Sequence, residues 1–228
     1  HAGPADEHAS PADEHAGRKA HLRFFNAIGT ADDVQIDLNF LFRVPLGDVS
    51  WRELWQPGAG PPTRVRVVSF AEAAAGKLVA ALARGLPRDV YDVRRLPSLN
   101  PAGWSDQHRI RRLFVAIAGV LDRPLTEYGV DRLRISDQQV RDQLDPMLTR
   151  DERVTAEELR SGAWQVMAPM LALDEAEREY MTRLQRGELR PELLFPEDAQ
   201  FAGRLARHPA LLWKAQNARD HTKARGSR

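Results

Sequence analysis

A block of charged residues between positions 77 and 92 contains the residue types that phosphate chemistry uses. Lys77 lies in a run of alanines, Arg84 follows seven residues later, and Asp89 and Asp92 come after a Gly-Leu-Pro break. A lysine or arginine can neutralise charge on a triphosphate, while carboxylates can hold Mg²⁺. The same residues also fit a solvated helix with an ordinary ion pair between Arg88 and Asp92. Spacing alone leaves both interpretations open.

The sequence predicts that Lys77 lies on a helix running from Ser69 to about Arg84. Ser69 and Glu72 have the spacing of a capping box at the start of a helix. Gly85 is the residue type that commonly ends a helix. The residues three and four positions from Lys77 are all alanines. Because these neighbours are small, a bulky ligand can reach the ammonium group.

A second helix is expected to begin near Arg88, after the Gly-Leu-Pro break. Asp89 and Asp92 are three residues apart and therefore share one face of that helix. On the preceding helix, Arg84 is two turns from Lys77 and lies near the same face. The pattern thus allows two cations on one helix to face two carboxylates on the next.

The sequence before this block predicts strands. Residues 34–46 alternate over their first half, which is typical of a half-buried strand. Residues 21–29 and 63–70 are also expected to be strands, and the Gly- and Pro-rich stretch 46–62 is expected to be a loop. The apolar positions of the alternating segment are Val34, Ile36, Leu38 and Phe40, and the polar ones are Gln35, Asp37 and Asn39.

The remainder of the chain is expected to be helical. Residues 105–121 have apolar side chains at helical spacing, and helices are also predicted over 135–148, 155–173 and 174–189. Pro209 separates two further helical segments near the C-terminus. Trp164 and Trp213 are expected in the core.

The C-terminal tail is basic and has two interpretations. It is either a frayed, solvated end of the chain or a segment that contacts RNA phosphates. The basic residues concerned are Lys214, Arg219, Lys223, Arg225 and Arg228.

Composition indicates an ordinary soluble protein. The 228 residues include 33 basic and 32 acidic side chains, so overall charge does not attract nucleic acid and any such binding must be local. The absence of cysteine excludes disulfides and thiolate metal sites. No apolar run is long enough to span a bilayer, so no membrane partner is expected and the cytoplasm is the expected location.

Residues 1–20 are expected to form a flexible lead-in, because they contain the sequence PADEHA twice and have no apolar face to bury. Their histidines recur every seven residues and could bind a metal adventitiously, but a solvated tail is the favoured interpretation. These histidines are His1, His8 and His15.

Four blocks of the chain together resemble the nucleotidyltransferase AbiEii/AbiGii toxin family, a branch of the polymerase-β-like nucleotidyltransferases. The blocks are DLNFLFRVPL, VVSFAEAAAGKLVAALARGLPRDVYDV, LDEAEREYMTRLQRGELRPELL and RHPALLWKAQNARDH, and the likeness covers most of residues 14–221. The most specific part runs from Lys77 through Arg84 to Arg88-Asp89-Val90-Tyr91-Asp92.

The resemblance implies an α+β fold: a partial nucleotidyltransferase-like sheet with helices, followed by an all-α C-terminal bundle. After the lead-in at 1–20, it implies a nucleotidyltransferase-like domain over 21–100 and a helical domain over 101–228. The implied activity is that of a toxin of a toxin–antitoxin or phage-defence system, which transfers NMP from an NTP to an RNA acceptor, with tRNA expected. The implied cofactors are NTP and Mg²⁺, and the implied protein partner is a cognate antitoxin of winged-helix type.

The resemblance also assigns roles to individual residues. Lys77 corresponds to the family's phosphate-binding lysine, and Arg84 is expected to contact the nucleotide with it. Asp92 is the preferred catalytic carboxylate and Asp89 the second choice. Asp37 lies on a strand where this superfamily often places a further metal-binding carboxylate.

One feature of the family is not found in this sequence. The Gly-Gly or Gly-Ser turn and the Asp-x-Asp metal motif that open the family's pattern have no counterpart here, so a relative lacking this first section is expected. Weak or absent transfer activity follows as an expectation. The alternative function is that of a catalytically inactive relative acting as a binding or regulatory protein.

Overall fold

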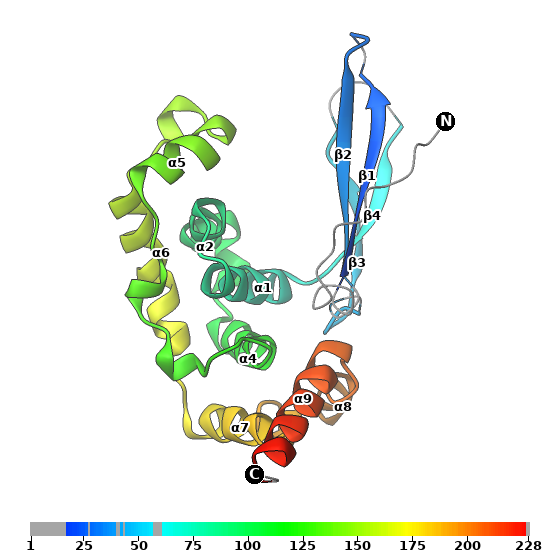
Figure 1. The fold of residues 1–228 in the computed structure, drawn as a ribbon, viewed down its shortest axis with the longest axis vertical. Coiled ribbons are helices and arrows are strands. Elements are labelled where there is room, and N and C mark those ends of the chain that lie inside the picture. Colours follow the sequence, from blue (N-terminus) through cyan, green and yellow to red (C-terminus); the bar gives the residue numbers. More distant parts are fainter. Residues whose placement is uncertain (1–16, 27, 40–41, 43, 57–60, 227–228) are drawn as a thin grey trace. The chain divides into compact units, whose positions relative to one another are not determined.

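The structure is a computed structural model that describes residues 17–26, 28–39, 42, 44–56 and 61–226 (Figure 1). The chain divides into two compact units, His1–Pro45 and Leu46–Arg228, which are described separately below. The PADEHA repeats with their three histidines, Phe40 and Arg228 lie outside the described residues. The expected domain boundary near residue 100 stays a prediction.

The first unit contains one antiparallel hairpin. Strand β1 (Gly17–Phe25) pairs with β2 (Ala31–Asn39) in a register that places Leu22 opposite Val34. Gly29 lies in the connecting turn with φ of +77°, a conformation that glycine adopts without steric cost. Both strands were predicted, although each begins a few residues earlier than its predicted range.

The alternation of apolar and polar residues in β2 fixes which side chains share a face, but not whether that face is buried. In the register, apolar Leu22, Val34 and Ile36 share one face of the hairpin. These side chains are 60%, 49% and 40% exposed, respectively, so the prediction of a half-buried strand was wrong. The physical reason is that burial needs a second layer, and this unit supplies only two strands among its described residues.

The second unit begins with another hairpin. Strand β3 (Ser50–Leu54) pairs antiparallel with β4 (Thr63–Val67), in a two-stranded sheet separate from the first. The sequence predicted β4, whereas β3 falls within the stretch predicted to be a loop. Its apolar residues are too few to show a period of two, and pairing with β4 defines it as a strand instead.

Packed helices form most of the second unit (Figure 1). Helix α1 (Phe70–Ala83) packs against α2 (Pro87–Leu99) and α4 (Gln107–Ala118), and α2 packs against α6 (Ala156–Leu171). The fully buried residues Leu78, Leu82, Val90, Ile110 and Phe114 belong to the core between them.

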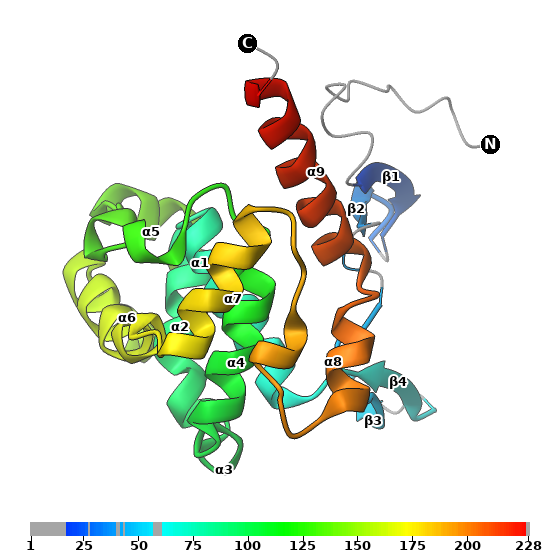
Figure 2. The ribbon, with the colours of Figure 1, turned by 90° about the horizontal axis from the view of Figure 1, so that it is seen from below.

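Further helices complete this unit (Figure 2). Helix α7 (Glu175–Gln185) contacts α4 and α9 (Pro209–Gly226). Shorter segments are α3 (Pro101–Trp104), α5 (Asp137–Gln143), α8 (Ala199–Leu205) and the single turns η1 (Leu125–Glu127), η2 (Val130–Arg132), η3 (Asp145–Met147), η4 (Arg150–Glu152) and η5 (Pro191–Leu193). The predicted α+β fold class is confirmed.

The start of α1 combines a predicted contact with an unexpected one. Ser69 caps the helix, because its side chain accepts a hydrogen bond from the Glu72 backbone N–H. The Glu72 carboxylate does not complete a capping box. It accepts hydrogen bonds from the backbone N–H groups of Leu46 and Gly47, at 2.9 and 3.0 Å.

The C-terminal end of the chain differs from expectation in one respect. Trp213 on α9 is 43% exposed, so its predicted place in the core was wrong, whereas Trp164 packs partly buried against the core. Two basic residues of the tail are held by the protein itself: Lys214 donates a hydrogen bond to the Leu121 carbonyl, and Arg219 to the Gly187 carbonyl. In the part of the chain that the structure describes, no helix is both long and apolar enough to cross a membrane.

Candidate functional site

Lys77 projects from the exposed face of α1. The opposite face of this helix is buried through small and aliphatic residues that include Ala74, Leu78 and Ala81. Gly76 and Lys77 lie between these buried positions, and 51% of the Lys77 side chain is exposed. The helix therefore holds the backbone of Lys77 firmly while it leaves the ammonium group open to solvent.

The Lys77 ammonium pairs with Asp92, the preferred of the two expected carboxylates. Its Nζ donates a hydrogen bond to Asp92 Oδ2 on α2 at 2.6 Å, and the Asp92 side chain is 38% exposed. Arg88, four residues earlier, makes no ion pair with Asp92 in the structure, so the alternative interpretation of an ordinary Arg88–Asp92 pair does not hold. Because α1 packs against α2, Lys77 of α1 pairs with Asp92 in place of Arg88, which lies on the same helix as Asp92.

The other cation and carboxylate of the block form a different kind of pair. Arg84 caps the end of α1 and donates two hydrogen bonds to Asp89, from Nε to Oδ2 at 3.0 Å and from Nη2 to Oδ1 at 2.6 Å. The Asp89 side chain is only 4% exposed. The hydrogen bonds to Asp89 raise the pKa of the Arg84 guanidinium above its ordinary value.

These two pairs differ in what they offer a ligand. Both Asp89 oxygens accept hydrogen bonds from one planar guanidinium, an arrangement that fixes geometry. The Lys77–Asp92 pair has a single hydrogen bond between partly exposed groups, and such pairs contribute about 0–1 kcal/mol. A phosphate can therefore replace Asp92 beside Lys77 at little cost to the fold.

Arg95, on the same helix as Asp92, makes a long-range contact that the sequence did not reveal. Arg95 donates hydrogen bonds from Nη1 to the Tyr91 hydroxyl and to Glu152 Oε1, both at 2.9 Å. The bond to Tyr91 lies within α2, whereas the bond to Glu152 connects α2 to the turn η4, 57 residues later. They stabilise the helix on which Asp92 lies.

Asp37 lies in the other compact unit. It is part of β2, and its Cα is opposite that of Lys19 in the hairpin register. The expected contribution of Asp37 to metal binding stays a prediction.

The described carboxylates do not form a complete metal site. Over residues 17–226, leaving aside the undescribed positions, no three His, Asp or Glu side chains gather as metal ligands. Asp89 and Asp92 each bind a protein cation instead.

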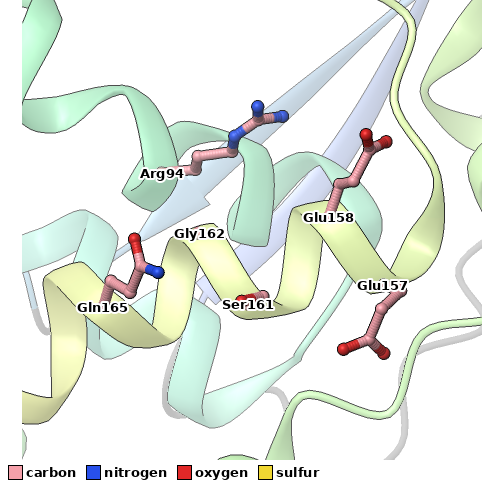
Figure 3. Close-up of a pocket in the computed structure, with 6 residues that line it drawn as sticks. All are labelled: Arg94, Glu157, Glu158, Ser161, Gly162 and Gln165. Carbon is pink, nitrogen blue, oxygen red and sulfur yellow. The ribbon is translucent and has the colours of Figure 1, made fainter.

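A surface hollow of about 440 Å³ lies between α2 and α6 (Figure 3). Arg94 lines it from α2, and Glu158 and Gln165 are among the residues that line it from α6. None of the predicted site residues lines this hollow. Its mixed charges and open shape suit solvent, and it takes no part in the candidate site.

A comparison with protein families identifies one family whose sequence model matches this chain. Residues 2–190 match the sequence model of the nucleotidyl transferase AbiEii toxin family, from type IV toxin–antitoxin systems. The chain belongs to this family. The match confirms the resemblance noted in the sequence and includes the whole block from Lys77 to Asp92. Neither the curated proteins nor the solved structures contain a match to this chain.

Membership of the AbiEii family carries general implications. The chain is a toxin of a type IV toxin–antitoxin system, and such a system implies an antitoxin partner. Nucleotidyltransferases of this kind use an NTP and a divalent metal.

Proposed function

We propose that this AbiEii toxin binds the phosphates of an NTP through Lys77 and transfers the NMP to an RNA acceptor, with tRNA as the expected acceptor. The observation that carries the proposal is the Lys77–Asp92 pair. An accessible ammonium lies 2.6 Å from a carboxylate, on a helix face whose other side is firmly packed.

Within this proposal, the two cations have different tasks. The Lys77 ammonium neutralises charge on the triphosphate, which favours binding and the departure of pyrophosphate. Arg84 and Asp89 hold the end of α1 against the start of α2, and so keep Lys77 and Asp92 in register. Arg84 remains the second candidate for a nucleotide contact, because 56% of its side chain is exposed. Mg²⁺ is the divalent cation that we expect to accompany the NTP.

Calorimetry tests nucleotide binding directly. Titration of Mg²⁺ and each NTP into the protein should show binding that Lys77→Ala weakens at least about tenfold, since the variant loses a charge-assisted phosphate contact. Arg88→Ala is the matched control, because Arg88 is also an exposed cation at this helix pair. Equal affinities of the wild type and Lys77→Ala would show that the phosphates bind elsewhere.

A transfer assay tests the chemistry. The protein is incubated with total tRNA, Mg²⁺ and one labelled NTP at a time, and incorporation is compared with that of Asp92→Asn and Asp37→Asn. Incorporation that is lost in Asp92→Asn supports the proposed catalytic carboxylate. Lys77-dependent NTP binding without incorporation would favour the alternative of a binding or regulatory protein.

The antitoxin assignment can be tested in cells. We propose that the partner is of the winged-helix type. Expression of the toxin should slow growth, and co-expression of the partner should restore it. Growth inhibition that Lys77→Ala leaves unchanged would contradict a role for nucleotide binding in toxicity.

A further inference from the structure

The β3–β4 hairpin carries two exposed indole rings. Trp51 on β3 is 57% exposed, and Trp55, directly after this strand, is 84% exposed. Tryptophan is usually buried to a large extent, so two exposed indoles four residues apart are informative. Trp51 lies on the strand itself, and Trp55 is the first residue beyond it.

Arginines accompany these rings. Arg52, Arg64 and Arg66 are all exposed. The register places Arg66 directly opposite Trp51, and Arg64 opposite Glu53. Residues directly opposite each other share a face, so Arg64 and Arg66 lie on the tryptophan side.

The hairpin is locally basic in a chain of nearly zero net charge. Between residues 50 and 67 there are three arginines and one acidic residue, Glu53. Apart from the backbone pairing of the two strands, no side-chain hydrogen bond or ion pair connects Arg52, Arg64 or Arg66 to any other residue that the structure describes. Three exposed guanidiniums without a side-chain partner among the described residues favour an anionic ligand.

We propose that the β3–β4 hairpin binds single-stranded RNA, and so guides the acceptor strand of the proposed transfer reaction. Bases stack on Trp51 and Trp55, since every base has a π face, and the arginines contact the phosphates. This inference rests on the proposed function for the identity of the RNA. Exposed rings that can stack on bases, beside guanidiniums that can contact phosphates, favour RNA over a protein partner.

Fluorescence anisotropy with a labelled, unstructured 12-nucleotide RNA tests the hairpin without any NTP. Each stacked base is worth about a 5- to 150-fold change in affinity, so Trp51→Ala/Trp55→Ala should raise Kd at least about tenfold. Trp213→Ala is the matched control, because Trp213 is an exposed tryptophan on α9. Unchanged melting temperatures would show that the variants fold, as expected for exposed side chains.

The salt dependence tests the arginines. Removal of two phosphate contacts in Arg64→Gln/Arg66→Gln should reduce the slope of log affinity against log salt by about 1.4. Arg141→Gln on α5 is the control for loss of an exposed arginine elsewhere.

The outcomes separate this inference from the proposed function. Absence of RNA binding, or equal binding by the wild type and the hairpin variants, would overturn the inference. Variants that retain RNA but lose the co-expressed antitoxin would also overturn it and assign the hairpin to the protein partner. Hairpin-dependent RNA binding in a protein without Lys77-dependent NTP binding would support the inference while the proposed function fails.

Discussion

Lys77–Asp92 and Arg84–Asp89 both connect α1 and its C-terminal cap to α2, yet the two pairs have different environments. Asp89 is 4% exposed and accepts two hydrogen bonds from a single guanidinium. Asp92 is 38% exposed and accepts one hydrogen bond from an ammonium group. One sequence block thus contains a buried, geometrically fixed pair and an exposed, exchangeable pair.

The comparison distinguishes a pair that anchors two helices from a pair whose lysine is available to a ligand. A buried carboxylate depends on its partner, because an uncompensated charge in the interior is costly. An exposed pair is solvated on both sides and loses little when one partner leaves. The first arrangement is suited to hold two helices together, and the second to release a lysine to a ligand.

The largest expected effect comes from removing the buried pair's cation. Arg84→Ala leaves the Asp89 carboxylate without its guanidinium and should lower the free energy of unfolding by about 2–3 kcal/mol. This value is below the full range for buried pairs, because Arg84 itself is 56% exposed. Urea denaturation measures the change, and Arg84→Lys should have an intermediate stability. A loss below about 0.5 kcal/mol would remove the distinction between the two pairs.

The exposed pair should show a smaller effect. A double-mutant cycle of Lys77→Ala and Asp92→Ala should give a coupling energy below about 1 kcal/mol, because both groups are well solvated. Denaturation curves of the four proteins provide this value. A coupling as large as the Arg84 effect would mean that Lys77 has an anchoring role and is not available to a phosphate.

The smallest effect concerns an exposed carboxylate at the start of α6. Glu158 accepts hydrogen bonds from the backbone N–H and hydroxyl of Thr155, at 2.8 and 2.9 Å. The backbone hydrogen bond from Thr155 and that from its hydroxyl hold the pKa of Glu158 below its usual value of 4.5. The ionised Glu158 side chain therefore contributes to the free energy of unfolding above pH 4.5. This contribution is lost as the pH falls through the lowered pKa.

The matched variant for this effect is Glu158→Gln, which retains an accepting oxygen but does not titrate in this range. Its free energy of unfolding should fall less than that of the wild type when thermal or urea denaturation is repeated from pH 6 toward pH 3. Parallel pH profiles of the two proteins would contradict the role of the charged capping box.

The helices were predictable because their signals are local. Thr155 with Glu158 and Asp174 with Glu177 form complete capping boxes at the predicted starts of α6 and α7. Ser69 caps α1 as predicted. A contact between residues three apart depends on little else in the fold, so sequence spacing is sufficient to find it.

Contacts between distant residues were less accessible to prediction. The sequence showed that Lys77 and Asp92 could lie close together, but not that Asp92 would prefer Lys77 over Arg88. Strand β3 was missed, because its pairing with β4 is what defines it. The exposed apolar face of β1–β2 was missed as well, since alternation fixes which side chains share a face, and not whether another layer covers them.

The contact between Glu72 and the chain at Leu46 and Gly47 has a consequence for how this toxin can vary. Glu72 holds the chain where it enters the second unit, and α1 begins only two residues before Glu72. The β3–β4 hairpin therefore belongs to a connecting segment, residues 48–68, whose two ends are both held at the N-terminal end of α1. Insertions, deletions or exchange of this segment change the loop without displacing α1, which makes the hairpin a place where relatives can diverge while the Lys77 helix stays in position.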